Sequence, residues 1–301
     1  MSRSFPPDVV VLDTVSLLHA RFARGKASPR LVTAKSYRLP EGTFEAGMVT
    51  PQLANEAALS DTLRRLRMET GKWEKVSLLL PDSWFRINNV DMPSLPTRES
   101  EARDVVRWSL KRTLPIAPED LRVSHTVLSR SAQGAKVLIV SALEATLSAI
   151  ERVFAAAGFE VALIEPLGLN LWNAIAVRES DTNADRLLVY MRDEDFTTAV
   201  FRGAQPLFIR SRTLRRDRTA EQEIRLSANY LRDSFSVDTF ASCYVAGQRG
   251  ADVHATLADE FHTEVRSVRF RDFAEGAPSA GVDAVEGWDA ELTACTGVFT
   301  G

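Results

Sequence analysis

The side chains with the strongest potential for chemistry are a run of carboxylates and a pair of histidines. Asp193, Glu194 and Asp195 are consecutive and could form a carboxylate cluster, but they fall between two predicted strands, where acidic residues are typical of a tight turn. His254 and His262 are eight residues apart on a helix-like segment. No third metal ligand accompanies them, which favours a solvated surface. The sequence therefore predicts no metal site and no catalytic residue.

Short catalytic and nucleotide-binding motifs are missing from the chain. Gly25–Ala27 and Gly71–Trp73 each have the Gly-Lys pair of a phosphate-binding loop, but both fail at the hydroxyl position that must follow. The glycine-rich dinucleotide motif and the serine-hydrolase and zinc-protease motifs are absent as well. The two cysteines, Cys243 and Cys295, cannot form a disulfide framework and are expected to be buried free thiols.

Arginines gather around one connection in the second half of the chain, at Arg210, Arg212, Arg215, Arg216 and Arg218. Such a patch could dock an acidic segment, a phosphorylated ligand or anionic lipid headgroups. The alternative is a solvated loop with salt bridges to Glu221 and Glu223.

Three aromatic residues, Trp84, Phe85 and Trp108, lie close together in the first half. Core packing is the simpler interpretation of them. An aromatic groove that takes a peptide is the alternative.

Composition and charge narrow the class of protein. Asp and Glu number 40 against 37 Lys and Arg, so the basic excess of a dedicated nucleic-acid binder is missing. The longest apolar runs, Val76–Leu80 and Val137–Leu143, are far shorter than the roughly 18 residues that a membrane helix needs. The N-terminus has no apolar core typical of a signal peptide. We expect a cytoplasmic protein that binds no nucleic acid and reaches a membrane only through a partner.

The elements that must position these residues recur in two halves. Strands are predicted at Val9–Leu12, Leu17–Phe22, Leu31–Leu39 and Val76–Leu80, with a helix at Gln52–Thr70 before the last of them. After a polar linker at 178–185, the same order returns, with strands at Leu187–Met191, Phe196–Phe201, Leu207–Arg212 and Cys243–Ala246 and a helix at Thr219–Ser234. An Arg-Gly hairpin follows the second strand in both halves. This internal duplication indicates two similar α/β lobes with a cleft between them.

The intervening residues have a different character. Phe85–Met92 and Leu121–Ser129 read as strands around a helix that begins at Thr97 and ends at about Thr113, so a small strand–helix–strand insert is predicted. Val137–Leu143 reads as a buried strand, followed by a helix at Glu144–Ala157, a strand at Glu160–Ile164 and a helix at Pro166–Val177.

The duplicated layout with this insert resembles the actin-like ATPase superfamily, most closely the PilM family of type IV pilus assembly proteins, relatives of FtsA. The resemblance covers most of the chain. It is carried by Leu79–Pro81, Arg103–Trp108, Pro115–Pro118, Val137–Ala142 and Glu165–Leu167.

The resemblance implies an α/β, actin-like (ribonuclease H-like) fold of two lobes. Residues 1–83 plus 131–180 would form the first lobe, 84–130 the insert and 186–275 the second lobe. Residues 282–301 would form a C-terminal helix that returns to the first lobe. The helical subdomain on the purine side of the nucleotide pocket would be missing, because the third strand of the second lobe leads almost directly into Thr219–Ser234.

The nucleotide site implied by the resemblance is degenerate. Family members hold phosphates with an Asp-x-Gly in each of two hairpins. The first hairpin keeps Asp13, Thr14 and Ser16 but has Val15 in place of glycine, and the second reads Tyr190–Arg192. The usual Gly-Gly turn is reduced to Gly247. A β-branched residue crowds a phosphate and disfavours positive φ, so bound ATP and Mg²⁺ remain possible but disfavoured.

The expected function is therefore that of a non-catalytic scaffold. PilM-like proteins bind the cytoplasmic tail of the inner-membrane protein PilN, and the resemblance implies such a partner, self-association into an oligomer or ring, and a place on the inner membrane. The candidate partner-binding residues are Trp84, Phe85, Trp108, Arg210, Arg212, Arg215 and Arg216. The alternatives are an actin-like ATPase or ATP-gated switch, and the cytoplasmic actin-like component of a type II secretion system.

Overall fold

Two five-stranded sheets organise the chain. The computed structural model describes residues 5–25, 28–47, 50–71, 74–112, 116–179, 183–203, 205–214, 219–235, 237, 239–274 and 287–300. In the first lobe the strand order is β10-β6-β1-β2-β3, formed by Glu160–Pro166, Lys75–Leu80, Asp8–Leu12, Ser16–Ala23 and Arg30–Arg38. The strands β1 and β6 are almost wholly apolar and buried, as expected where helices or other layers cover both faces of a sheet.

The sheet of the second lobe repeats this topology. Its order is β13-β12-β11-β14-β15, formed by Gln205–Thr213, Asp195–Arg202, Asp185–Arg192, Ser242–Ala246 and Val265–Ser267. In both sheets the first three strands are antiparallel neighbours, and the first strand also pairs in parallel with the fourth. The predicted duplication is confirmed at the level of strand order and direction.

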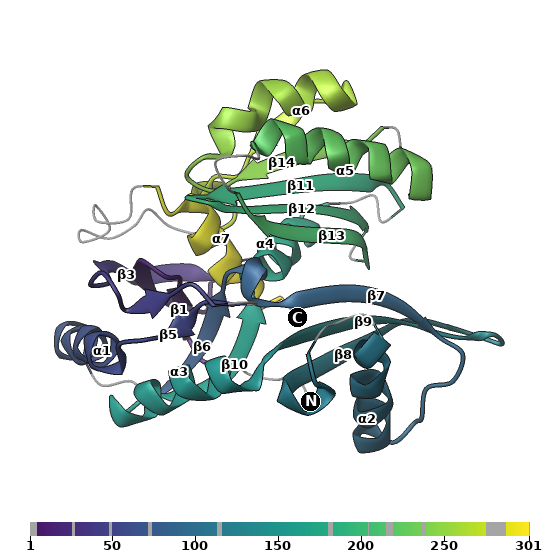
Figure 1. The fold of residues 1–301 in the computed structure, drawn as a ribbon. Coiled ribbons are helices and arrows are strands. Elements are labelled where there is room, and N and C mark those ends of the chain that lie inside the picture. Colours follow the sequence, from purple (N-terminus) through teal and green to yellow (C-terminus); the bar gives the residue numbers. More distant parts are fainter. Residues whose placement is uncertain are drawn as a thin grey trace.

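Helices form three layers around the two sheets (Figure 1). The helices α1 (Glu56–Thr70) and α3 (Glu144–Ala156) cover the outer face of the first sheet, and α5 (Ala220–Phe235) and α6 (His254–Phe261) cover that of the second. Between the sheets lie α4 (Leu167–Ala176) and α7 (Asp289–Gly297), which share one hydrophobic core with residues of both sheets. This central core holds the lobes together: Trp172 of α4 stacks on Phe201 of β12, with the ring centroids 4.1 Å apart.

The helix α1 begins later than the sequence predicts. Gln52 and Leu53 form a short strand, β5, which pairs with β4 (Phe44–Glu45). The side chain of Asn55 then accepts a hydrogen bond from Ala58 N at 3.0 Å and caps the helix. A predicted start at Gln52 was therefore wrong, because the capping residue and not the apolar period sets the first turn.

The insert forms its own three-stranded sheet, in the order β7-β9-β8, from Arg86–Met92, Gly134–Leu143 and Leu121–Ser131. The helix α2 (Glu99–Ser109) covers one face of it. The middle strand β9 lies within 131–180, the range assigned from the sequence to the first lobe. Val137–Leu143 is therefore a strand of the insert sheet, and a boundary at 130 divides the β8–β9 hairpin.

The connection between β13 and α5 is short, since β13 ends at Thr213 and α5 begins at Ala220. These positions leave no room for the helical subdomain that the resemblance places there. Within the ranges that the structure describes, no helix has both the length and the apolar composition needed to cross a membrane.

Candidate functional site

The first candidate site is the hairpin between β1 and β2, at the junction of the lobes. Asp13 Oδ1 accepts hydrogen bonds from Val15 N at 2.8 Å and Ser16 N at 2.6 Å, and Asp13 Oδ2 accepts one from Ser16 Oγ at 2.6 Å. The carboxylate thus caps its own turn, as Asx turns do. Thr14 is exposed at the tip, and the side chain of Val15 is 49% exposed.

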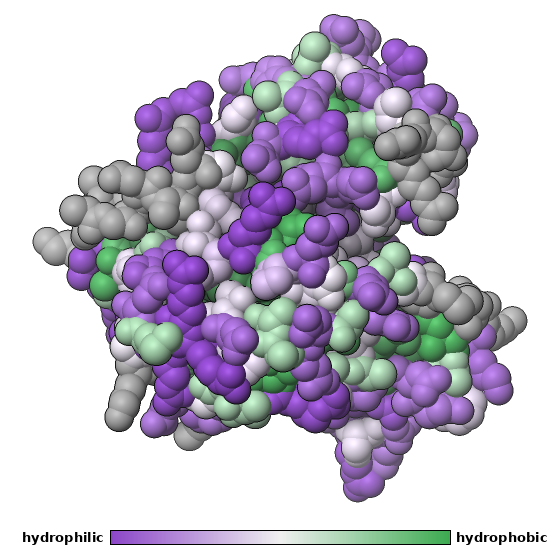
Figure 2. All heavy atoms as spheres, turned by 60° about the vertical axis from the view of Figure 1, so that its left-hand side comes forward, coloured by the Kyte–Doolittle hydropathy of each residue, from purple (hydrophilic) through white to green (hydrophobic). Residues whose placement is uncertain are grey.

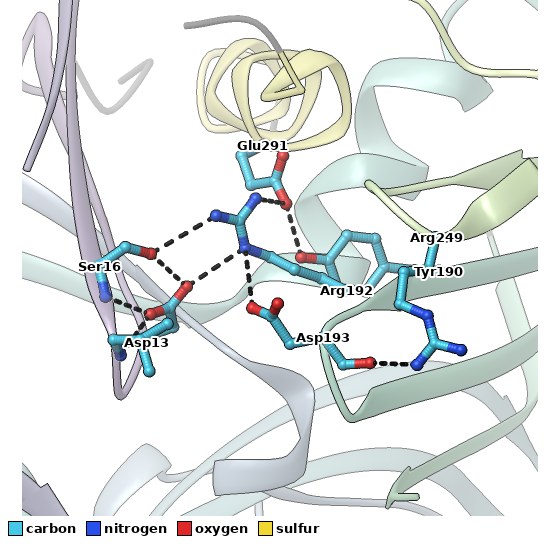
Figure 3. A network of polar contacts seen from close by, with 8 residues as sticks. Asp13, Ser16, Tyr190, Arg192, Asp193, Arg249 and Glu291 are labelled. Atoms are coloured by element: carbon cyan, nitrogen blue, oxygen red, sulfur yellow. Dashed lines mark hydrogen bonds and ion pairs between the residues drawn. The ribbon is translucent and has the colours of Figure 1, made fainter. Parts of the chain in front are cut away.

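Arg192, at the end of β11, joins this hairpin to the second lobe and to the C-terminal helix (Figure 3). Its Nε lies 3.3 Å from Asp13 Oδ2, and its Nη1 lies 3.1 Å from Glu291 Oε1 on α7. The guanidinium also lies over the ring of Trp288, 3.7 Å from the centroid. One arginine side chain therefore links the two hairpins and α7, at the place where the resemblance puts a bound phosphate.

Burial makes this network electrostatically strong. Glu291 is 0% exposed, and desolvation raises the pKa of its carboxyl group although Arg192 and the hydroxyl of Tyr190 oppose the rise. The hydroxyl of Tyr190 donates to Glu291 Oε1 at 2.8 Å. Desolvation disfavours the charged form of Arg192, but Glu291, Tyr190, Asp13 and Asp193 together outweigh it and raise the pKa of the guanidinium. Arg192 therefore stays charged and holds Glu291 and Asp13.

Gly247 lies against the second hairpin. Its φ is +90°, and a Cβ placed on it would lie 2.2 Å from Met191 O. Arg249 N donates to the same carbonyl at 3.1 Å. The glycine thus permits close packing of its turn on the end of β11. Asp13 and Ser16 lie in the first hairpin, and Gly247 packs on the end of the second hairpin, beside Arg192.

Sequence analysis missed a second feature of the junction, two desolvated carboxyl groups, of which Asp82 is buried and Asp195 half-buried. Asp82, in the 3₁₀ turn η1 (Asp82–Trp84), accepts a hydrogen bond from Gly168 N at 2.8 Å. Desolvation raises the pKa of Asp82 to about 6, with a further rise from the charge of Asp195. Desolvation also raises the pKa of Asp195 to about 6, while a hydrogen bond from Ser83 opposes this rise.

These two carboxyl groups come from different lobes, and the charge of Asp195 acts on Asp82. A clue in the sequence is the Pro-Asp that follows the largely apolar strand β6, at the end of that strand. Of the predicted acidic turn, only Asp193 and Glu194 lie outside the strands, and Asp195 is the first residue of β12. In the described ranges, no three His, Cys, Asp or Glu side chains are grouped as a metal site requires.

The second candidate site is a cavity between the first lobe and the insert. It is small, with about 10 Å³ of free space, and its lining is formed by Thr50, Trp84, Phe85, Arg86, Ile116, Leu121, Ser141, Ala142 and Leu143. Trp84 and Phe85 are buried and contribute to this mostly apolar lining. Trp108 does not, because it lies on the outside of α2 with 59% of its surface exposed and Lys111 over its ring. The structure therefore brings together two of the three aromatic candidates.

The predicted arginine patch is only partly within the described residues. Arg210 forms an ion pair with the fully buried Glu223 at 3.0 Å, so it serves the packing of α5 on β13. Arg212 is exposed. Arg215 and Arg216 lie outside the described residues, and nothing is concluded about them.

Comparisons with known proteins identify the fold of this chain. Models of protein families give no match, and neither do curated protein sequences. The chain has the actin-like ATPase fold: it is similar to a Bacteroides thetaiotaomicron protein of that fold, with a TM-score of 0.56, 12% identity and 95% of each chain covered.

The likeness to a chain of the PilM–PilN type IV pilus biogenesis complex is stronger, with a TM-score of 0.80 at 16% identity, over 97% of both chains. The cytoplasmic domain of EpsL, an inner-membrane component of the Vibrio cholerae type II secretion system, gives 0.53 at 13% identity, over 98% of this chain and 94% of that one. The resemblance to PilM is thus confirmed for the fold.

Proposed function

We propose that this chain is a non-catalytic scaffold of the type IV pilus inner-membrane platform, binding the cytoplasmic tail of a membrane-anchored, PilN-like partner. The observation that carries the proposal is the likeness, over 97% of both chains, to a chain of the PilM–PilN complex. In this role the protein works in the cytoplasm, reaches the inner membrane through its partner and self-associates into an oligomer or ring.

The cavity between the first lobe and the insert is the proposed site for the tail. Most of its lining is apolar, and Ile116 in that lining is half-buried. The space inside it is about 10 Å³, room for about one water molecule, so we propose that the tail lies across its rim. Each aliphatic side chain that the tail buries against this apolar rim contributes up to about 1.5–3 kcal/mol.

Ile116→Lys is expected to weaken binding of a synthetic peptide of the partner's tail by about tenfold or more, because a charge at the rim cannot be buried against the peptide. The measurement is isothermal titration calorimetry. Val90→Lys is the matched control, since Val90 is half-buried and packs on the same insert core without lining the cavity. Equal losses in the two variants, or none in Ile116→Lys, would place the tail elsewhere.

The non-catalytic part of the proposal is supported by the side chains of Arg192 and Val15, which stand where Mg²⁺ and phosphate would bind. A Mg²⁺ ion at Asp13 would meet the guanidinium of Arg192, which lies 3.3 Å from that carboxylate. Two cations so close repel each other strongly where the surroundings are desolvated. The side chain of Val15 stands where the phosphate requires bare backbone.

Millimolar Mg·ATP is therefore expected to leave the thermal melting temperature of the protein unchanged, with Mg·ADP as the comparison. A ligand at about 100 times its Kd adds about 2.7 kcal/mol to the stability, which a melting curve detects as a clear shift. An ATP-specific shift would contradict the scaffold-only proposal.

Such a shift would favour the second candidate function, an ATP-gated switch that uses the junction. The observation in its favour is that Asp13 is retained and positioned at the hairpin tip. A role in type II secretion is tested separately, by whether the peptide that binds comes from a pilus or a secretion partner.

A further inference from the structure

The two lobes meet in two separate places. The first is the central core around α4 and α7, with the ion pairs of Arg192 beside it. The second is the contact between the insert and β13, the edge strand of the second sheet. In Figure 1, β13 runs above β7, to one side of α4 and α7. A single contact region lets one lobe rotate on the other, whereas a second region at a distance from it restrains that rotation.

The insert is firmly joined to the first lobe. Arg122 on β8 donates from Nε to Glu144 at 2.9 Å and from Nη1 to Glu151 at 2.7 Å, and both acids belong to α3. Ile87 and Val140 of the insert sheet pack against the outer core of the first lobe. The insert is therefore an arm of the first lobe that reaches the second lobe.

The arm holds the second lobe through side-chain amides. Asn89 Nδ2 on β7 donates to Pro206 O at 2.6 Å and to Leu207 O at 3.2 Å. In a more exposed position, Gln205 Nε2 donates to Leu128 O on β8 at 3.3 Å. Each of β7 and β13 is the edge of its own sheet and the two are in contact, yet among the described residues they share no strand ladder. The contact can therefore open without breaking a sheet.

The backbone of β13 is suited to this kind of contact. Pro206 is the partner of Phe201 and Phe208 that of Val200, so Leu207 is an extra residue in a β-bulge. A bulge alters the direction of the groups beside it, and here two successive carbonyl groups meet one amide. Pro206 also has no N–H to donate to a neighbouring strand. This part of the edge accepts hydrogen bonds and disfavours strand pairing.

The closed arrangement depends on few interactions along this side. Figure 2 keeps the vertical order of Figure 1, and the surface in it is hollowed at the right-hand edge, between the second lobe above and the lower half of the molecule. Both partners of Asn89 are carbonyl oxygens, so only the nitrogen of its amide can face them. Two hydrogen bonds between neutral groups favour a closed state by roughly ten- to a hundredfold, which one substitution can reverse.

We propose that Asn89 is a latch that holds the arm against the second lobe, and that release of its amide lets the second lobe rotate about the central core. In the closed state, β7 and β13 lie against one another. In the open state, the edges of both strands are accessible. The latch involves neither the cavity nor its rim, so this inference goes beyond the proposed scaffold function and does not rest on it.

The distance between the arm and the second lobe reports on the latch. It is measured by double electron–electron resonance between spin labels at Glu119→Cys in the insert and Ser234→Cys on α5. Both positions are exposed, whereas the native Cys243 and Cys295 are 0% exposed, so the label attaches to the added thiols. The parent should give one narrow distribution of distances.

Asn89→Asp is the variant that should open the latch. It hardly changes the shape of the side chain but replaces the donor by a carboxylate, which the two carbonyl oxygens repel. At about pH 7.5 we expect a second distance, with a share of the molecules at least about tenfold that in the parent. Lowering the pH towards about 4 protonates the carboxyl group, whose O–H can donate, so this share should fall again.

Asn88→Asp is the matched control, since Asn88 precedes Asn89 on β7 and successive side chains of a strand point to opposite faces. It should keep the distances of the parent at each pH. Parent-like distances for Asn89→Asp at both pH values, or the same change in Asn88→Asp, would overturn the latch. Near-UV circular dichroism checks the fold. If Asn89→Asp does not fold, Asn89→Ala removes the donor without adding a charge, and parent-like distances in that variant would equally contradict the proposal.

Discussion

Replacing Arg192 by methionine is expected to lower the free energy of unfolding by about 3–5 kcal/mol. The substitution removes the cation between Asp13 and Glu291 and leaves the carboxyl group of Glu291, which is 0% exposed, with only the hydroxyl of Tyr190. Methionine keeps contact with the ring of Trp288, so the loss is mainly electrostatic. Equilibrium unfolding in urea measures it.

Arg249→Met is the control, because Arg249 lies in the same view of Figure 3 but is largely solvated and bonds to Asp252 and to Asp193 O. It should cost less than about 1 kcal/mol. The double variant Arg192→Met with Glu291→Gln should recover part of the loss, because the buried charge is then gone. A parent-like stability of Arg192→Met would show that the network contributes nothing, and simple additivity of the two changes would show that the residues are not coupled.

Asp82→Asn is expected to raise the stability by about 2–3 kcal/mol at about pH 8. Burial raises the pKa of Asp82 from 3.8 to about 6, so the folded state binds this proton more tightly than the unfolded chain. The stability that this carboxyl contributes is full below its unfolded pKa and is lost as the pH rises through about 6. Asparagine is neutral at every pH, and its oxygen can still accept from Gly168 N. The advantage of the variant should therefore shrink as the pH falls from 8 to about 4.

The measurement is the difference in unfolding free energy between variant and parent across this pH range. Asp91→Asn serves as the matched change, since Asp91 is exposed on β7 and should give a flat difference near zero. A flat profile for Asp82→Asn as well, or a variant that is less stable than the parent at high pH, would mean that burying the Asp82 carboxylate does not destabilise the folded state.

Much of the fold follows from local patterns that can be read along the chain. Apolar runs such as Val9–Leu12 and Leu187–Met191 predict buried strands, and the repeated hairpins predict the duplication. The run Val137–Leu143 was placed within the range of the first lobe, whereas it is the middle strand of the insert sheet, because an apolar strand signals burial but not the sheet that it joins. Likewise, an apolar period cannot locate the start of α1, which depends on the cap at Asn55.

The contacts at the junction of the lobes were harder to predict from the sequence. The resemblance drew attention to Asp13 and Gly247. It also showed that the second hairpin, Tyr190–Arg192, lacks the Asp-x-Gly motif that holds a phosphate. It did not indicate that Arg192 joins Asp13 to Glu291, because these residues are far apart in the chain and meet only through the packing of α7. Asp82 is a single carboxylate after a strand, and only its burial in the folded chain, with a smaller effect of Asp195, makes its pKa unusual. Trp108 and Trp84 look alike in sequence, yet one is exposed and the other lines a cavity.

A guanidinium that belongs to the chain differs in one respect from a diffusible ligand at the same place. Arg192 has no free concentration: it cannot be depleted, hydrolysed or displaced by competitors as a dissolved nucleotide can. Its ion pairs with Asp13 and Glu291 form whenever the chain folds. The effective concentration of the guanidinium at these carboxylates is set by the strand and helix that hold the three residues in place. Under the proposed scaffold function, the relative position of the lobes does not depend on the energy supply of the cell. Assembly of such a scaffold would then respond to how much of the protein and its proposed partner is made, and not to metabolic state.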